Sequence, residues 1–360
     1  MTYDAILLAG FGGPRRPEDV VPFLRNVTAG KNIPDARLAQ VGEHYSLFGG
    51  RSPINDKTQE LRDALQAALH ERGIALPVVI GNRNWDPYTV DALRQIADAG
   101  GRRVLALITA AYSSYSGCRQ YREDIAAQAA AVGGLRIDQV RAYFNTPGFV
   151  QANVDAALAA VRDLIEGGYA AGDIELVFVT HSIPLAMEAA SGVARPASYL
   201  GQHEEVARLV RDQVARASGV QLPSRLVYCS RSGPPQVPWL EPDINDALAD
   251  IARRGRKAVV VAPIGFIADH MEVVYDLDTE AARTAHDLGL GFIRAATVGT
   301  HPAFVASLVE AVRERLDGRP AAVVGALPAW EPRCADHCCA AGRPPGAGQH
   351  GLPEAKKEAR

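Results

Sequence analysis

Residues 5–14 read Ala-Ile-Leu-Leu-Ala-Gly-Phe-Gly-Gly-Pro, an apolar run that ends in a glycine-rich turn. The run is apolar at successive positions, so both faces of the strand it predicts must be buried, as in the parallel sheets of α/β proteins. Similar runs alternate with longer helical patterns and cover residues 77–80, 104–108, 176–179, 225–228 and 258–261. This alternation predicts an α/β fold whose parallel sheets are covered by helices on both faces.

The order of elements runs twice along the chain. The glycine turn at 10–14 follows a strand in the first half, and the stretch Thr-His-Ser-Ile-Pro at 180–184 follows one in the second. We therefore predict two Rossmann-like domains that face each other across a cleft at the carboxyl ends of their strands. With 360 residues, the chain is long enough for two domains. The predicted domains cover residues 1–146 and 147–326, and a cysteine-containing tail with a disordered end covers 327–360.

Composition excludes several classes of partner. The 38 basic and 41 acidic side chains give a net charge of −3, which offers no electrostatic footprint for nucleic acid or an anionic membrane. No apolar run approaches the roughly 18 to 20 residues of a membrane span, and the start of the chain lacks the basic region of a signal peptide. We expect a cytoplasmic protein without stable membrane insertion. Its 5 cysteines then favour metal binding or burial over disulfides.

The glycine turn does not match a dinucleotide-binding fingerprint. The pattern G-x-G-x-x-G needs a glycine at position 15, which is Arg15. Pro14 also removes an amide that a phosphate cradle would use. The glycines instead predict a tight turn that lets the backbone approach a large, flat ligand.

Three acidic residues follow the last of these apolar runs at a helical spacing. Glu272, Asp276 and Glu280 are each four residues apart, so in an α-helix they share one face with a rise of about 6 Å per step. A divalent cation would relieve their mutual repulsion, although a solvated acidic face has the same spacing. The carboxyl end of another predicted strand carries His181, and imidazole with carboxylate suits Fe²⁺. A histidine alone is more often a satisfied core residue.

Six segments, taken together, resemble the ferrochelatase family. They are residues 11–14, 49–54, 81–85, 180–184, 230–242 and 265–272, which occur in family order within about residues 4 to 316. The resemblance implies two chelatase-type domains and a lyase that inserts Fe²⁺ into a porphyrin during haem biosynthesis. It implies that His181 faces the porphyrin centre, that Glu272 lies on the opposite wall, and that Asp276 and Glu280 form an outer metal path. A histidine with a near-neutral pKa can accept a pyrrole proton or bind the incoming metal.

The resemblance also implies porphyrin contacts and a substrate. Ser52 and Tyr121 match residues that contact the porphyrin, and Tyr45 and Arg51 are expected at its rim. The chain has Phe11 where some bacterial relatives carry a tyrosine that ligates iron, so the axial ligand stays open. Residues 49–57 are short and polar where membrane-associated relatives carry an apolar lip, which favours coproporphyrin III. Protoporphyrin IX as substrate, insertion of cobalt or nickel into another tetrapyrrole, and a non-catalytic porphyrin or haem carrier are the alternatives, and transient contact with neighbouring haem-pathway enzymes is expected.

The cysteines fall into two groups. Cys334, Cys338 and Cys339 lie near the end of the chain, and Cys118 lies far upstream; four thiolates suit an iron–sulfur cluster or zinc. The adjacent pair is awkward as simultaneous ligands, and a neighbouring histidine, residue 337, could compete. A subset of ferrochelatases holds a [2Fe–2S] cluster with one cysteine inside the fold and three near the carboxyl terminus, which this arrangement matches. Cys229 is expected to be a buried apolar residue.

Overall fold

Two parallel sheets of identical topology form the framework. The computed structural model describes residues 2–30, 33–193, 195–233, 235–332 and 334–341. The first sheet has the strand order β2-β1-β3-β4 and the second the order β6-β5-β7-β8, and every pairing is parallel. The strands are β1 (Ala5–Gly10), β2 (Val78–Asn82), β3 (Arg103–Ile108), β4 (Arg136–Gln139), β5 (Ile174–His181), β6 (Ser224–Cys229), β7 (Ala258–Ala262) and β8 (Gly291–Arg294). The prediction of an α/β fold in which the order of elements runs twice is confirmed.

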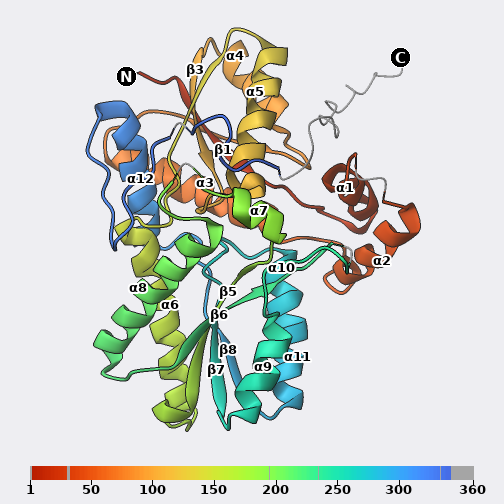
Figure 1. The fold of residues 1–360 in the computed structure, drawn as a ribbon. Helices are drawn as coiled ribbons and strands as arrows, with labels where there is room; N and C mark the ends of the chain where they lie inside the picture. The colour runs from red at the N-terminus through yellow and green to blue at the C-terminus, as the bar shows by residue number, and fades with distance from the viewer. Residues whose placement is uncertain (1, 31–32, 194, 234, 333, 342–360) are drawn as a thin grey trace.

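Helices cover both faces of each sheet. The sheet of β1–β4 with its helices is called the first unit and the sheet of β5–β8 with its helices the second unit, and Figure 1 shows the two units one above the other. Successive side chains of a central strand pack into the cores on opposite faces of the sheet, which explains why the strand runs are apolar throughout. Leu176 and Phe178 of β5 belong to one apolar core, and Val177 and Val179 belong to the core on the opposite face. The covering helices are α3 (Ile54–Glu71), α4 (Thr89–Asp98), α5 (Gln120–Val132), α6 (Pro147–Glu166), α8 (Tyr199–Ser218), α9 (Ile244–Arg253) and α11 (Ala282–Asp287).

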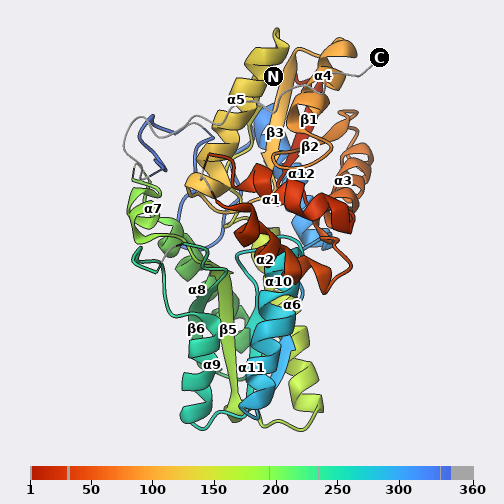
Figure 2. The ribbon, with the colours of Figure 1, turned by 90° about the vertical axis from the view of Figure 1, so that its right-hand side faces the viewer.

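A helical hairpin that the sequence patterns do not predict projects from the first unit. It consists of α1 (Val20–Val27) and α2 (Asp35–Ser46), with a small core of its own around Phe23 and Leu38. In Figure 2, α2 lies next to α10 (Met271–Val274), which belongs to the second unit. His44 of the hairpin stacks on Tyr275, with ring centroids 4.0 Å apart and planes 11° from parallel. The hairpin therefore bridges the two units beside the acidic segment.

The end of the chain returns to the first unit. Helix α12 (Pro302–Asp317) packs against both α3 and α6. Beyond it, the backbone amide of Val324 donates to the carbonyl of Asn145 at 2.9 Å, and the indole of Trp330 packs edge-on against Phe144 with 5.3 Å between ring centroids. Trp330 is 3% exposed, so the tail is packed on the body at this point. The predicted domain boundaries stay a prediction, and the end of the tail, 342–360, lies outside the described residues.

Among the helices that the structure describes, none combines the length and apolar character needed to cross a membrane.

Candidate metal-insertion site

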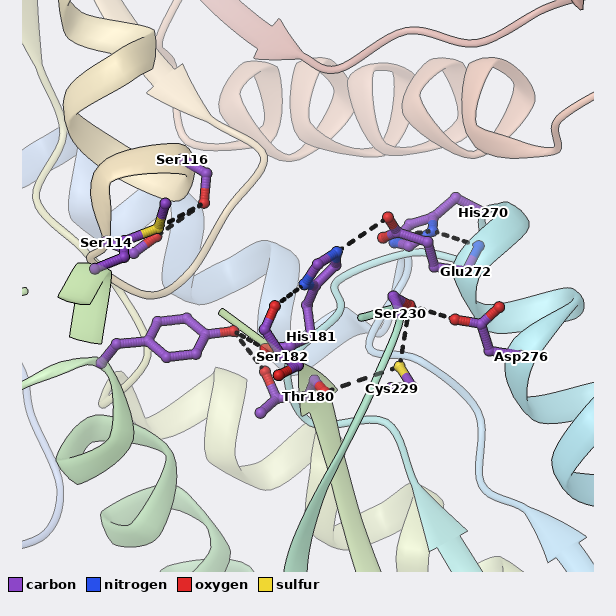
Figure 3. A network of polar contacts seen from close by, with 12 residues as sticks. Ser114, Ser116, Thr180, His181, Ser182, Cys229, Ser230, His270, Glu272 and Asp276 are labelled. Carbon is purple, nitrogen blue, oxygen red and sulfur yellow. Dashed lines mark hydrogen bonds and ion pairs between the residues drawn. The ribbon is translucent and has the colours of Figure 1, made fainter. Parts of the chain in front are cut away.

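The imidazole of His181 lies at the carboxyl end of β5 with both nitrogens engaged (Figure 3). Its Nδ1 contacts the carbonyl oxygen of Ser182, and its Nε2 lies 3.2 Å from Oε1 of Glu272. A carbonyl oxygen can only accept a hydrogen bond, so Nδ1 carries a proton. When the imidazole is neutral, its lone pair is therefore on Nε2 and faces Glu272. This is the tautomer that presents a metal ligand or a proton acceptor to the carboxylate side.

Glu272 reaches His181 because their strands are neighbours. β5 pairs with β7, and the chain leaves β7 through a turn that leads to α10. His270 caps this helix by accepting a hydrogen bond from the Glu272 amide at 3.2 Å. The expectation that Glu272 lies on the wall of the porphyrin site opposite His181 stays a prediction. The two side chains are in contact, because the carboxyl ends of adjacent parallel strands meet at the same edge of the sheet.

The contact fixes the charges of both partners. Burial disfavours the charged imidazole, but the adjacent Glu272 carboxylate outweighs this effect and raises the pKa of His181 to about 9. Burial likewise opposes ionisation of Glu272, and the His181 imidazolium nevertheless lowers its pKa to about 2. Burial lowers the pKa of His270, which favours its neutral form. His181 is therefore a cation paired with Glu272 at neutral pH, rather than the near-neutral base expected from its residue type.

The other two acids belong to an irregular helix. The α-helix α10 ends at Val274, and a π-helical segment, η4 (Asp276–Ala281), follows it. The expectation of one regular α-helix is therefore wrong, although the acids do interact. Burial and the charges of Glu272 and Glu280 raise the pKa of Asp276 to about 7, while a hydrogen bond from the Ser230 hydroxyl opposes this rise. π-Helical segments often occur at functional sites.

Ser230 is a site residue to which the sequence analysis gave no role. It follows β6 and has a φ of +64°, a left-handed conformation that is unfavourable for residues other than glycine. Its hydroxyl contacts Asp276 and lies 3.3 Å from the sulfur of Cys229, as Figure 3 shows. Its place in the specific motif at 230–242 was the available signal, but the left-handed backbone that turns it toward the acid is not visible in the sequence.

The expected porphyrin contacts lie in different environments. Burial, with the nearby charges of Glu272 and Asp276, raises the pKa of Tyr45, which belongs to α2. Arg51 is exposed and ion-paired with an aspartate, residue 56. Ser52 and Tyr121 are 3% and 4% exposed, and the Tyr121 ring lies beneath a guanidinium, that of residue 83, at 4.8 Å. The contacts of all four with porphyrin stay predictions.

The predicted cluster cysteines lie near one another. Cys118, in the π-helical turn η2 (Tyr115–Arg119), hydrogen-bonds to Cys334, and the sulfurs of Cys338 and Cys339 are 3.8 Å apart. Cys339 has a φ of +52°. The hydrogen bond from Cys118 lowers the pKa of Cys334 to about 5 against burial, and the Arg195 guanidinium, 3.5 Å from the Cys334 sulfur, adds to this effect. Within the described part of the chain, however, no three His, Cys, Asp or Glu side chains form a ready-made metal site.

Cys229 lies apart from these thiols. It is 2% exposed in the core of the second unit, as predicted for a buried apolar residue.

Comparisons with known proteins agree with the motifs. The sequence profile of the ferrochelatase family matches residues 3–316. The chain is 49% identical over 356 residues to coproporphyrin III ferrochelatase from Streptomyces griseus, covering 95% of this chain and 94% of the relative. It is 44% identical over 354 residues to a ferrochelatase from Rhodopirellula baltica, with 96% of each chain covered.

Among solved structures, the fold is similar to that of SirB from Bacillus subtilis with Fe³⁺, with a TM-score of 0.51 and 13% sequence identity. The similarity covers 88% of this chain and 98% of SirB, and at this identity it concerns the fold alone. Taken with the sequence profile, which covers most of the chain, and the relatives that match it at high coverage, these findings show that the chain belongs to the ferrochelatase family.

Proposed function

We propose that this chain inserts Fe²⁺ into coproporphyrin III as a step of haem biosynthesis. The His181–Glu272 pair is the observation that carries the proposal. A proton holds these two side chains together at 3.2 Å, where a divalent cation can replace it between an imidazole nitrogen and a carboxylate oxygen. Membership of the ferrochelatase family and the names of the Streptomyces and other bacterial relatives support the same reaction.

The charges suggest an order in which the chain's own residues act. Asp276 and Glu280 offer carboxylates to the hydrated ion on the outer side of Glu272. As the dication approaches the ion pair, its field lowers the proton affinity of His181, so the Nε2 proton leaves and the lone pair becomes available. Glu272, whose side chain is 45% exposed, stays in contact with water and can pass protons to it.

Insertion must also remove the two pyrrole protons of the porphyrin. Two N–H bonds break, iron–nitrogen bonds form, and two protons leave to water, so the charge of the ion is balanced. Neutral His181 can accept one proton at Nε2, and Glu272 can relay it. A cleft that fits the bent macrocycle better than the flat one would lower the barrier further by differential binding.

The direct test is iron insertion by purified variants. We expect His181→Ala to abolish turnover and Glu272→Gln to lower kcat at least tenfold, about 1.4 kcal/mol or more. His286→Ala is a matched control, because the His286 side chain is 88% exposed and contacts Asp287 rather than the pair. Near-normal activity of either site variant would remove that residue from the mechanism. Porphyrin binding without any turnover by the unmodified protein would instead indicate a carrier.

The choice of porphyrin is the finer part of the proposal. Residues 49–57 form a short, polar segment with no apolar lip, and several relatives are named coproporphyrin III ferrochelatases. A side-by-side assay should give a higher kcat/KM for coproporphyrin III than for protoporphyrin IX. The opposite preference would overturn this part of the proposal and leave the iron insertion intact.

We also propose that four porphyrin-facing residues belong to this site. Tyr45 has the strongest support, because it lies near the charges of Glu272 and Asp276. For Arg51 the support is its exposure just before α3, and for Ser52 and Tyr121 it is the family resemblance alone, since both are buried. Substitutions at Tyr45 should raise the KM for porphyrin more than those at Tyr121.

We further propose that Cys118, Cys334, Cys338 and Cys339 bind a [2Fe–2S] cluster. The chemistry of the donor set fits, because four thiols from two distant parts of the chain lie in one region, and Arg195 can compensate negative charge there. A bound cluster would supply a cross-link between the tail and the first unit. Iron insertion does not change the oxidation state of the metal, so we assign the cluster a structural role.

Elemental analysis tests this assignment. Anaerobically purified protein should contain iron and acid-labile sulfide and absorb visible light that bleaches on reduction. Cys118→Ser should lose that absorption and lower thermal stability together, whereas Cys229→Ser should keep the absorption. Zinc in place of iron and sulfide would contradict the cluster while keeping the ligand set.

We place the reaction in the cytoplasm, where reduced thiols persist; all 5 cysteines are free in the structure. Transient contact with neighbouring haem-pathway enzymes remains part of the proposal as the route by which porphyrin is received and passed on.

A further inference from the structure

A buried polar network lies directly behind His181. Thr180, Tyr199 and His203 are 0%, 7% and 0% exposed. The Thr180 hydroxyl lies 2.8 Å from the Tyr199 hydroxyl and 2.9 Å from His203 Nε2. His203 Nδ1 lies 2.8 Å from the Tyr199 carbonyl oxygen, and the Tyr199 hydroxyl lies 3.0 Å from the carbonyl oxygen of His181. Polar groups this deeply buried are costly unless they are paired, so the network defines one arrangement of this region.

The partners fix the direction of its hydrogen bonds. The Tyr199 carbonyl can only accept, so His203 carries its proton on Nδ1 and accepts at Nε2. Burial lowers the pKa of His203 to about 3, which keeps it neutral. The Thr180 hydroxyl must therefore donate to His203. With that proton used, the single proton of the Tyr199 hydroxyl is shared between the two acceptors left to it, the Thr180 oxygen and the His181 carbonyl.

The His181 carbonyl needs this donor because the neighbouring strand has ended. The amide of Gly265 donates to the carbonyl of Val179 at 3.1 Å, and β7 has already ended at Ala262. Carbonyls two residues apart in a strand point the same way, so the carbonyl of His181 points in the same direction as that of Val179 but lies beyond the Gly265–Val179 hydrogen bond. Tyr199 supplies the donor from α8 instead.

The peptide held in this way controls the imidazole. The carbonyl of His181 belongs to the peptide that leads into Ser182, whose amide donates to the Cys229 carbonyl at 2.8 Å and whose hydroxyl donates to the Leu240 carbonyl at 2.8 Å. The carbonyl of Ser182 in turn accepts from His181 Nδ1. Figure 3 shows the imidazole of His181 between Ser182 and Glu272. A shift of the His181 carbonyl would therefore move the imidazole away from the carboxylate.

The network is anchored in the other half of the molecule. The ring of Tyr112, which follows β3, stacks on His203 with 3.6 Å between centroids, and its hydroxyl donates to the Ile264 carbonyl at 3.0 Å. The amide side chain of Gln202 binds both the amide and the carbonyl of Ser113, at 2.8 and 3.3 Å. Helix α8 is thus fixed against the first unit at the residues that hold His181.

We propose that Tyr199, oriented by Thr180 and His203, is a positioning residue for metal insertion that holds the Nε2 of His181 at the distance from Glu272 at which both can bind the ion. The proposal rests on the proposed role of His181. Tyr199 is not a catalytic residue, because it contacts the backbone of His181 and not its imidazole.

The experiment compares variants that remove one hydroxyl each. Tyr199→Phe and Thr180→Val should lower kcat about fivefold and raise the KM for Fe²⁺, with the KM for porphyrin unchanged. Thr180→Ser retains the donor and should restore kcat. Tyr143→Phe is the matched control, because the Tyr143 hydroxyl makes a similar buried hydrogen bond, to the Ile108 carbonyl at 2.8 Å, in the first unit.

The outcomes separate the possible failures. A fall in kcat for Tyr199→Phe no larger than that for Tyr143→Phe at equal thermal stability would overturn the positioning role, and so would failure of Thr180→Ser to restore what Thr180→Val loses. If Tyr199→Phe does not fold, the two Thr180 variants decide. His181→Ala run in parallel keeps the two proposals apart, since its activity alone reports whether His181 acts.

Discussion

Two histidines connected to one hydrogen-bond network have opposite charge states because their partners differ. His181 contacts a carboxylate, which raises its pKa to about 9, whereas His203 contacts a hydroxyl and a carbonyl, and burial lowers its pKa to about 3. The sequence analysis correctly singled out His181 by its place after a strand. It could not foresee the raised pKa, because the contact with Glu272 depends on which strands are neighbours in the sheet. His203 gave no signal, since a histidine within a helical pattern looks like any surface residue.

The buried, neutral His203 predicts a particular loss of stability in acid. Its pKa is about 3 in the folded protein and about 6.5 in an unfolded chain, so below pH 6.5 the unfolded state binds a proton that the native state does not. The free energy of unfolding should fall by about 1.4 kcal/mol per pH unit from this residue alone, between those two pKa values. In urea unfolding, the stability difference between the wild type and His203→Gln should therefore narrow from pH 7.5 to pH 5. A stability difference that stays constant over this pH range would show that His203 binds a proton in the native state as readily as in the unfolded state.

Ser230 offers a prediction at the metal path. Its hydroxyl donates to Asp276 and favours the charged carboxylate against burial and the neighbouring acids. Ser230→Ala should therefore protonate Asp276 more readily and raise the KM for Fe²⁺ severalfold at pH 7, with kcat at saturating iron nearly unchanged. Ser116→Ala is a suitable control, because Ser116 is exposed and its hydroxyl contacts Ser114 and Met187, on the other side of Figure 3 from the acids. An unchanged KM for iron would remove Asp276 from the metal path.

At the level of elements, the buried strands were predictable and the polar edges were not. The six apolar runs correspond to β1, β2, β3, β5, β6 and β7. The missed strands β4 and β8 are edge strands of 4 residues each, with the sequences RIDQ and GFIR, so they lack the continuous apolar run that identified the other two edge strands, β2 and β6. The α1–α2 hairpin was missed because its apolar residues pack on one another in a separate small core. The π-helical segment was missed because the expected spacing assumed 3.6 residues per turn.

The turn after β7 is an element whose shape depends on one glycine. A Cβ atom at Gly265 would lie 2.2 Å from the Thr180 hydroxyl oxygen, within a buried part of the second unit. Gly265→Ala should therefore displace Thr180 and lower the free energy of unfolding by about 1–3 kcal/mol, as overpacking does. Gly172→Ala is the control, because a Cβ there meets nothing within 4 Å. Equal unfolding midpoints for the two variants would contradict the close packing of this turn.

For the whole molecule, the repeated sheet order was predictable, but the way the halves are joined was not. The alternation of strands and helices predicts the fold of each unit by itself. The contacts that join the two units come from α12 and the chain beyond it, which the alternation does not include. The sequence analysis described the tail by its cysteines alone, but an apolar side chain, Trp330, also packs it against the body. The Trp330 ring packs edge-on against Phe144, and its centroid lies 5.9 Å from the Arg195 guanidinium. One large side chain therefore contacts residues from both halves.

Trp330 should then stabilise the whole molecule whether or not a cluster binds. Trp330→Ala removes a ring that is 3% exposed and should cost about 3–5 kcal/mol, measured as a lower midpoint of thermal unfolding. Trp330→Phe should cost much less, because the indole nitrogen has no hydrogen-bond partner among the described residues and a phenyl ring keeps the edge-on contact with Phe144. Leu288→Ala, at a residue that is 39% exposed, is the control. If Trp330→Ala matched that control while loss of Cys118 still destabilised the protein, the tail would be held by its thiols alone.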